Sequence, residues 1–93
     1  MVLTLSSRVG RSGAAISAQV DGQTVALDVN KGVCYGLNAV GTRIWDLLAA
    51  PLTVGEICAQ LVSEYEVSLP ECQAQTQALL EDLSREGLLL VAG

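Results

Sequence analysis

Three cysteines, one lysine and a few paired carboxylates are the side chains of this chain that could perform catalysis. Nucleophilic catalysis by serine or cysteine usually needs a histidine base, and the 93 residues include no histidine. The only lysine, Lys31, falls in a predicted turn. The carboxylate pairs are Glu64 with Glu66 and Glu81 with Asp82. They fall at predicted helix ends and solvent faces, where a carboxylate is ordinarily a solvated charge, so the inventory argues against an enzyme.

Metal and cofactor sites are equally poorly supported. Cys34, Cys58 and Cys72 form no C-x-x-C pair and match no structural zinc spacing. Their odd number argues against a disulfide framework, so we expect reduced, mostly buried thiols in a cytoplasmic protein. Gly10 and Gly13 do not lie between a strand and a helix, as a phosphate-binding loop requires. We therefore predict no metal and no cofactor.

Composition and charge narrow the class of protein further. Hydrophobic residues make up 51% of the chain and charged residues 16%, which excludes simple disorder. No segment approaches the roughly 18 uninterrupted apolar residues of a membrane span, so we expect a soluble protein with no membrane partner. The net charge of −5 is uneven, because residues 1–45 carry +2 and residues 46–93 carry −7.

The first half of the chain predicts a small sheet. Residues 1–13 are rich in serine and glycine and suggest a flexible arm or an irregular first strand, ahead of a single domain over residues 14–93. From residue 15 apolar residues alternate with polar or small ones through three short segments, the last at 33–37. Asp21-Gly22 and residues 30–32 supply the turns. The pattern is typical of a three-stranded antiparallel meander with one face apolar and the other small or polar.

The second half predicts three helices. Asn38, Thr53 and Ser68 are good N-caps, and the last two are each followed by glutamate three residues later, as in a capping box. Gly87 is placed to end the third helix, and residues 88–91 form an apolar tail that suggests a last strand or a strap over the core. We predict an α+β, winged helix-turn-helix-like fold, in which a three-stranded antiparallel sheet precedes a three-helix bundle.

This fold offers a candidate site for a peptide. The strand at 33–37 carries no charge, and its Gly36 lets another backbone approach closely. The helix at 68–87 has an apolar stripe with Leu79 and Leu83 near its centre. Gln75, Asp82 and Glu86 line one flank of that stripe. A peptide could add to the strand and place apolar anchors against the helix, unless the C-terminal tail or a helix covers the strand.

DNA binding is the alternative that a winged helix suggests, with the third helix as the recognition helix. The charged residues of that helix are Glu71, Glu81, Asp82, Glu86 and Arg85. Phosphate contacts supply most of the affinity for nucleic acid and need Lys or Arg. The DNA-binding reading is therefore disfavoured, and we expect no nucleic-acid partner.

One stretch of the chain resembles a known family. Tyr35-Gly36-Leu37-Asn38, followed by Gly41 and Ile44-Trp45, resembles the PqqD-like family, and the similarity extends over roughly residues 14–91. The resemblance implies a non-catalytic recognition element for the leader segment of a ribosomally made precursor peptide. It also implies that the leader adds as a strand to the third strand and packs against the third helix. The peptide-binding residues that it implies are Val33, Cys34, Tyr35, Gly36 and Leu37 on the strand, and Gln75, Leu79, Asp82 and Leu83 on the helix.

The resemblance also implies an enzyme partner. A stand-alone domain of this type looks most like the lasso-peptide version, which presents the leader to a cysteine protease that removes it. The runner-up is a peptide chaperone that delivers a precursor to a radical SAM enzyme, as in pyrroloquinoline quinone biosynthesis. No residue pattern in this chain separates the two.

Overall fold

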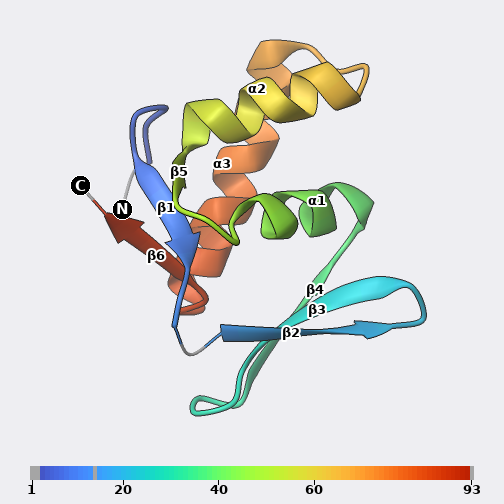
Figure 1. Cartoon of the computed structure of the whole chain (residues 1–93), viewed down its shortest axis with the longest axis vertical. Helices are drawn as coiled ribbons and strands as arrows, with labels where there is room; N and C mark the ends of the chain where they lie inside the picture. The colour runs from blue at the N-terminus through green and yellow to red at the C-terminus, as the bar shows by residue number, and fades with distance from the viewer. Residues whose placement is uncertain (1–2, 14, 93) are drawn as a thin grey trace.

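The computed structural model describes residues 3–13 and 15–92. The elements follow in the order β1 (Arg8–Arg11), β2 (Ala15–Val20), β3 (Gln23–Asp28), β4 (Val33–Leu37), α1 (Ala39–Leu47), β5 (Leu52–Thr53), α2 (Val54–Glu64), α3 (Leu69–Arg85) and β6 (Leu89–Ala92) (Figure 1). The predicted α+β class and the order of a three-stranded antiparallel sheet before three helices are confirmed.

The predicted meander is the sheet β2-β3-β4, in which both pairings are antiparallel. Asp21 and Gly22 have φ values of 53° and 79°, the positive pair that a type I′ hairpin turn requires. The turn between β3 and β4 depends on Asp28, whose side chain accepts hydrogen bonds from the backbone N–H groups of Asn30 and Lys31, at 3.0 and 3.2 Å. Both turns therefore form where the sequence placed them.

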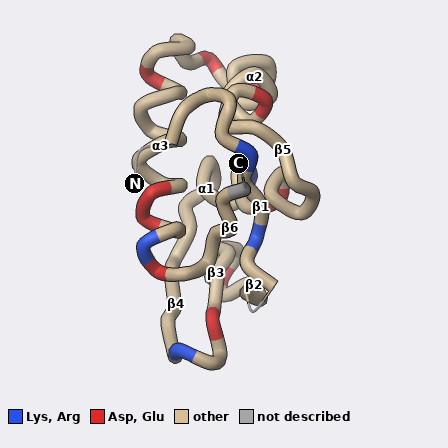
Figure 2. The backbone as a smooth tube through the Cα atoms, turned by 90° about the vertical axis from the view of Figure 1, so that its left-hand side faces the viewer, with Lys and Arg blue, Asp and Glu red and all other residues tan. Residues whose placement is uncertain are grey.

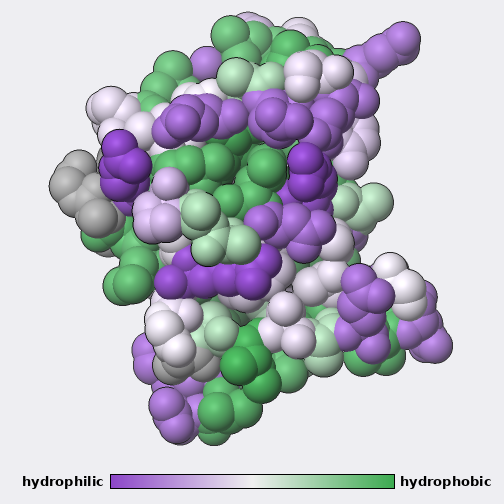
Figure 3. All heavy atoms as spheres, viewed as in Figure 1, coloured by the Kyte–Doolittle hydropathy of each residue, from purple (hydrophilic) through white to green (hydrophobic). Residues whose placement is uncertain are grey.

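The larger apolar side chains of β2 and β3 lie on the outer face of this sheet, whereas those of β4, Val33, Tyr35 and Leu37, lie on the inner face, so the prediction of one apolar face is wrong. Ile16 pairs with Leu27 and Leu27 with Cys34, which puts these three residues on one face, and Ile16 is 51% exposed. Figure 3 shows apolar side chains at the surface of this lower part of the molecule. On the opposite face Ala26 and Leu37 are buried in the core. The small side chain of Ala26 leaves room there for α1, and the larger apolar residues of the inner face come from β4.

A second sheet, in the order β5-β1-β6, was not expected as such. Within residues 3–13 the structure has a strand, β1, at the centre of this sheet, and Leu3 and Val9 belong to the buried core. The apolar tail is β6, which pairs with β1 along its length. Gly87, with φ of 76°, ends α3 and turns the chain toward β6. Residues 1–2, 14 and 93, which include both limits of the predicted domain, lie outside the described residues.

Side-chain caps begin α2 and α3. At α2 the predicted capping box is complete, because Thr53 Oγ1 accepts from the Glu56 N–H and Glu56 Oε1 accepts from the Thr53 N–H. At α3 the Ser68 hydroxyl accepts from the Glu71 N–H, while the Glu71 carboxylate accepts from Gln75 one turn later. Both helices therefore begin at the residues that the sequence indicated.

Trp45 lies at the centre of the core that joins the two sheets to the helices. Its side chain is 1% exposed, and the Arg11 guanidinium stacks 4.8 Å from the ring centroid. Arg11 also donates two hydrogen bonds to the Trp45 carbonyl oxygen, at 3.0 and 2.7 Å. These contacts attach β1 to α1. Among the described residues, no helix combines the length and the apolar character that crossing a membrane requires.

Candidate functional site

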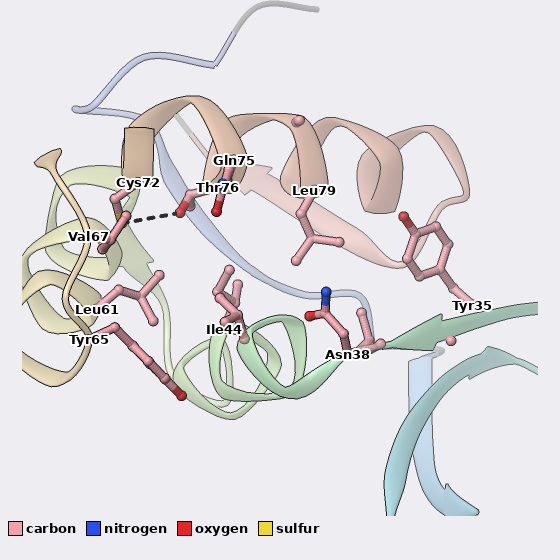
Figure 4. Close-up of a pocket in the computed structure, with 14 residues that line it drawn as sticks. Tyr35, Asn38, Ile44, Leu61, Tyr65, Val67, Cys72, Gln75, Thr76 and Leu79 are labelled. Atoms are coloured by element: carbon pink, nitrogen blue, oxygen red, sulfur yellow. Dashed lines mark hydrogen bonds between the residues drawn. The ribbon is translucent and has the colours of Figure 1, made fainter. Parts of the chain in front are cut away.

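A groove of about 520 Å³ opens where β4 and α1 face α2 and α3 (Figure 4). Its walls are Tyr35, Gly36, Leu37, Asn38, Val40, Ile44, Leu61, Tyr65, Val67, Cys72, Gln75, Thr76, Ala78 and Leu79. None of these side chains is charged, so the groove suits an uncharged, mostly apolar ligand.

The strand side of the groove presents an unpaired edge. In the order β2-β3-β4 the outer edge of β4 pairs with no described strand, so its outward N–H and C=O groups are available to another chain. Gly36 has open space where a Cβ atom would stand, with no heavy atom of another part of the chain within 4 Å. Just beyond β4, Asn38 accepts a 2.8 Å hydrogen bond from the Gly41 N–H and begins α1. This cap fixes the angle at which the edge enters the groove.

The helix side is formed by the exposed edge of the α3 apolar stripe. Leu79 is half-buried and points into the groove, and Gln75 lies one turn before it (Figure 4). Cys72 and Thr76 lie deeper and are 3% and 1% exposed. The Cys72 thiol contacts the Thr76 hydroxyl and the Cys58 carbonyl oxygen, both at 3.9 Å. Burial raises the pKa of the neighbouring Cys58 thiol, so Cys58 acts as a neutral core residue.

A side-chain hydrogen bond joins β4 to α3 at one end of the groove. The Tyr35 hydroxyl donates to Asp82 Oδ2 at 3.2 Å, and Arg85 contacts the other carboxylate oxygen at 3.1 Å. Burial raises the pKa of Tyr35 above its usual value, and the negative charge of Asp82 raises it further. The phenol therefore stays protonated at neutral pH and remains a donor.

An ion pair joins α1 to α2 beside the groove. Arg43 donates two hydrogen bonds to the Glu64 carboxylate, at 2.9 and 2.8 Å, and Gln60 donates a third. These bonds lower the pKa of Glu64 to about 2. Ile44 and Leu61, on the same two helices, line the groove, so the pair holds two of its walls together.

This ion pair predicts a loss of stability in acid. Because the folded-state pKa of Glu64 lies below its ordinary value of 4.5, its contribution is complete above pH 4.5 and disappears as pH falls toward about 2. We expect wild type to need more urea for unfolding than Glu64→Gln at pH 6, and the two midpoints to converge between pH 4.5 and 2. A gap that stays constant over that range would contradict a role for the ionised carboxylate.

The structure brings five of the nine predicted site residues to the groove. They are Tyr35, Gly36, Leu37, Gln75 and Leu79. Asp82 lies at the end of the groove through its bond to Tyr35. Val33 and Cys34 belong to the β4 edge but lie outside the groove, and the Cys34 side chain is exposed on the outer face of the sheet.

Leu83 requires a correction. Its side chain is 0% exposed and packs in the core, so it cannot contact a peptide in the groove. Four residues after Leu79 on a helix, a side chain is rotated by about 40°. That rotation is enough to move it from the rim of the stripe to its buried centre.

α1 and α2 contribute groove walls that helical periodicity alone does not identify. Val40 and Tyr65 are the informative cases, because apolar residues at helical spacing are typical of core positions, yet these two are 37% and 40% exposed. Val67, between α2 and α3, also lines the groove. No local signal separates a core stripe from a groove wall, since both are apolar and the difference depends on how far apart the helices pack.

Charge is distributed unevenly around the groove. Asp and Glu gather on α3 and near the α2–α3 connection, whereas Lys and Arg, apart from Arg85, lie on β1, in the β3–β4 turn and, as Arg43, on α1 (Figure 2). Arg85 is paired with Asp82. The surface of α3 is therefore acidic, and its groove-lining residues are uncharged.

The family model for coenzyme PQQ synthesis protein D (PqqD) matches residues 9–89. The structure of TbiB1 in complex with the TbiA(beta) leader peptide is 35% identical and superposes with a TM-score of 0.78 over 86% of this chain and 93% of that one. A lasso peptide synthetase B1 complexed with the leader peptide is 27% identical, with a TM-score of 0.77 over 88% and 96%. No curated protein matches this chain significantly.

Proposed function

Since this chain belongs to the PqqD family, we propose that it is a leader-peptide recognition element, which binds the leader of a ribosomal precursor peptide by strand addition to β4. The main observation in support of this proposal is the uncharged groove of about 520 Å³ that runs beside the unpaired edge of β4. Both similar solved structures are complexes with leader peptides, which supports the same ligand class for this groove.

The energetics of strand addition explain why the groove is needed. Ordering an extended peptide costs about 1–2 kcal/mol per residue in backbone entropy. Each ladder hydrogen bond returns only about 0.5–1.5 kcal/mol, so pairing with β4 alone roughly breaks even. Two or three apolar anchors, at about 1.5–3 kcal/mol each, supply the net affinity. The groove offers Leu79, Val40 and Tyr65 as half-buried or exposed surfaces for such anchors.

We propose that the domain acts without catalysis of its own and presents the bound leader to a cysteine protease in lasso-peptide biosynthesis. The similarity to a lasso peptide synthetase B1 supports this version. The second candidate is delivery of a precursor to a radical SAM enzyme in pyrroloquinoline quinone biosynthesis, which the description of the matching family favours. The genes beside this one distinguish the two, because the first needs a leader protease and the second a radical SAM enzyme.

DNA binding has no comparable support. The charged residues of α3 are mostly acidic, and Arg85 already pairs with Asp82. A duplex would therefore meet a repulsive helix surface, and no gel shift is expected even at low salt.

The proposed function predicts saturable binding of a fluorescein-labelled leader peptide from a precursor encoded beside the gene, measured by anisotropy. Strand addition further predicts a period of two in the effect of backbone N-methylation. Methylation should weaken binding at alternate positions, whose N–H groups face β4, and should have little effect at the positions between them. The absence of saturable binding for every neighbouring precursor would refute the proposal, and a uniform methylation profile would refute strand addition.

A further inference from the structure

The hydrogen bond between Tyr35 and Asp82 closes the groove at the end where β4 meets α3. The Tyr35 backbone is paired with Ala26 of β3, and its hydroxyl is tied to α3 at 3.2 Å. Arg85 holds the second oxygen of the same carboxylate at 3.1 Å. The phenol is therefore fixed at both ends and forms a wall across the groove, with Tyr65 at the opposite end (Figure 4).

The position of this wall matters because of the alternation of side chains along β4. Val33, Tyr35 and Leu37 point to the inner side of the sheet, whereas Cys34 and Gly36 point to the outer side. In a strand that adds to β4, the side chain opposite each β4 residue lies on the same side, with Cβ atoms about 4.5–5.5 Å apart. The peptide side chain opposite Leu37 faces the open groove, and the one opposite Tyr35 meets the phenol and the carboxylate.

We propose that the Tyr35–Asp82 bridge sets the register of the bound peptide, by admitting only a small side chain opposite Tyr35 and directing bulky apolar side chains into the groove beyond Leu37. This inference rests on the proposed function. If the peptide shifted by one residue along β4, its bulky apolar side chains would point to the outer face of the sheet. A slip of two residues would restore the correct face but press an anchor against the bridge.

Side-chain alternation alone permits the peptide to shift along β4 by two residues. The Tyr35–Asp82 bridge therefore excludes these shifts. Tyr35 and Asp82 act here as specificity-determining residues, and the ligand class is narrowed to peptides with a small residue at the edge of their apolar anchors. A peptide without a small residue to fit opposite Tyr35 would have no preferred register. It could pair with β4 in several registers, because the backbone hydrogen bonds repeat every two residues.

A tryptophan scan of the leader peptide tests this inference. Each position is replaced in turn, and affinity is measured for wild type, Asp82→Ala, Tyr35→Phe and the matched control Glu81→Ala. Asp82 has a 41% exposed side chain, so Asp82→Ala is expected to fold. Glu81→Ala makes the same charge change on α3 at a residue outside the groove. Thermal unfolding of each variant checks that the fold is retained.

In wild type we expect one groove-facing position at which tryptophan weakens binding by about tenfold or more, because the bridge leaves no room for it. Asp82→Ala and Tyr35→Phe should relieve most of that loss at that position alone, and Glu81→Ala should leave the profile unchanged. The inference is overturned if wild type has no such position, or if the intolerant position is the same and equally costly in Asp82→Ala and Tyr35→Phe. If the unsubstituted leader fails to bind wild type, the proposed function itself is refuted.

Discussion

Replacing Leu79 by glutamate is expected to abolish leader binding while the domain remains folded. Leu79 is half-buried and projects from α3 into an uncharged groove. The substitution removes an apolar contact surface worth about 1.5–3 kcal/mol and places a carboxylate where a bound peptide would deprive it of water. Together these effects should weaken binding at least 100-fold, measured by anisotropy or calorimetry with a leader peptide that binds wild type.

Ala74→Glu is the matched control for this variant. Ala74 is an exposed residue of the same helix and is not part of the groove wall. Ala74→Glu therefore has the same net charge as Leu79→Glu but places the new carboxylate outside the groove. Its affinity should remain within about threefold of wild type, because residue 74 does not line the groove, and as a surface substitution it should change stability by only about 0.5 kcal/mol. Equal affinities of Leu79→Glu and Ala74→Glu would move the binding site away from this groove.

Replacing Trp45 by alanine should have the largest effect on stability. The side chain is 1% exposed, and its removal leaves a cavity at the junction of β1, α1 and the helical core. Such a change costs about 3–5 kcal/mol, out of the roughly 5–15 kcal/mol that a domain of this size has. The loss of the Arg11 stacking contact adds to it. Urea unfolding followed by circular dichroism should show a midpoint shifted far toward zero, or no folded baseline.

Trp45→Phe separates packing from hydrogen bonding. The indole Nε1 is buried and makes no hydrogen bond within the part of the chain that the structure describes. Phenylalanine therefore removes an unpaired donor as well as some volume, and the variant should lose much less stability than Trp45→Ala. Equal destabilisation by the two substitutions would mean that the indole nitrogen has a partner essential to the fold.

The turns and caps could be read from the sequence because they depend on neighbouring residues. Asp21-Gly22 adopts the positive φ values of its turn, and Thr53 and Glu56 satisfy each other's backbone N–H groups three residues apart, so the structure has both features. The sheet β5-β1-β6 could not be read in this way. Val9 pairs with Leu52 and with Val91, and such long-range partners leave no periodic signal in a strand of four residues.

The candidate site was predictable on its strand side and only partly on its helix side. Gly36 lies in the last strand of a three-stranded meander, so its position at an unpaired edge followed from local pattern alone. On α3, periodicity placed Leu79 and Leu83 in one stripe, but only the packing of α1 and α2 decides that Leu79 reaches the groove and Leu83 the core. The wall residue Tyr65 depends on the same packing.

The apolar outer face of the β2-β3-β4 sheet bears on how a leader sequence can vary. A strand added to β4 sends every second side chain into the groove and the rest to the outer face, beside Cys34 and Leu27. On the proposed binding mode, only the first set of side chains would contact this domain. Substitutions in the second set should be silent for affinity, and those positions are left free to instruct whichever protein next handles the complex.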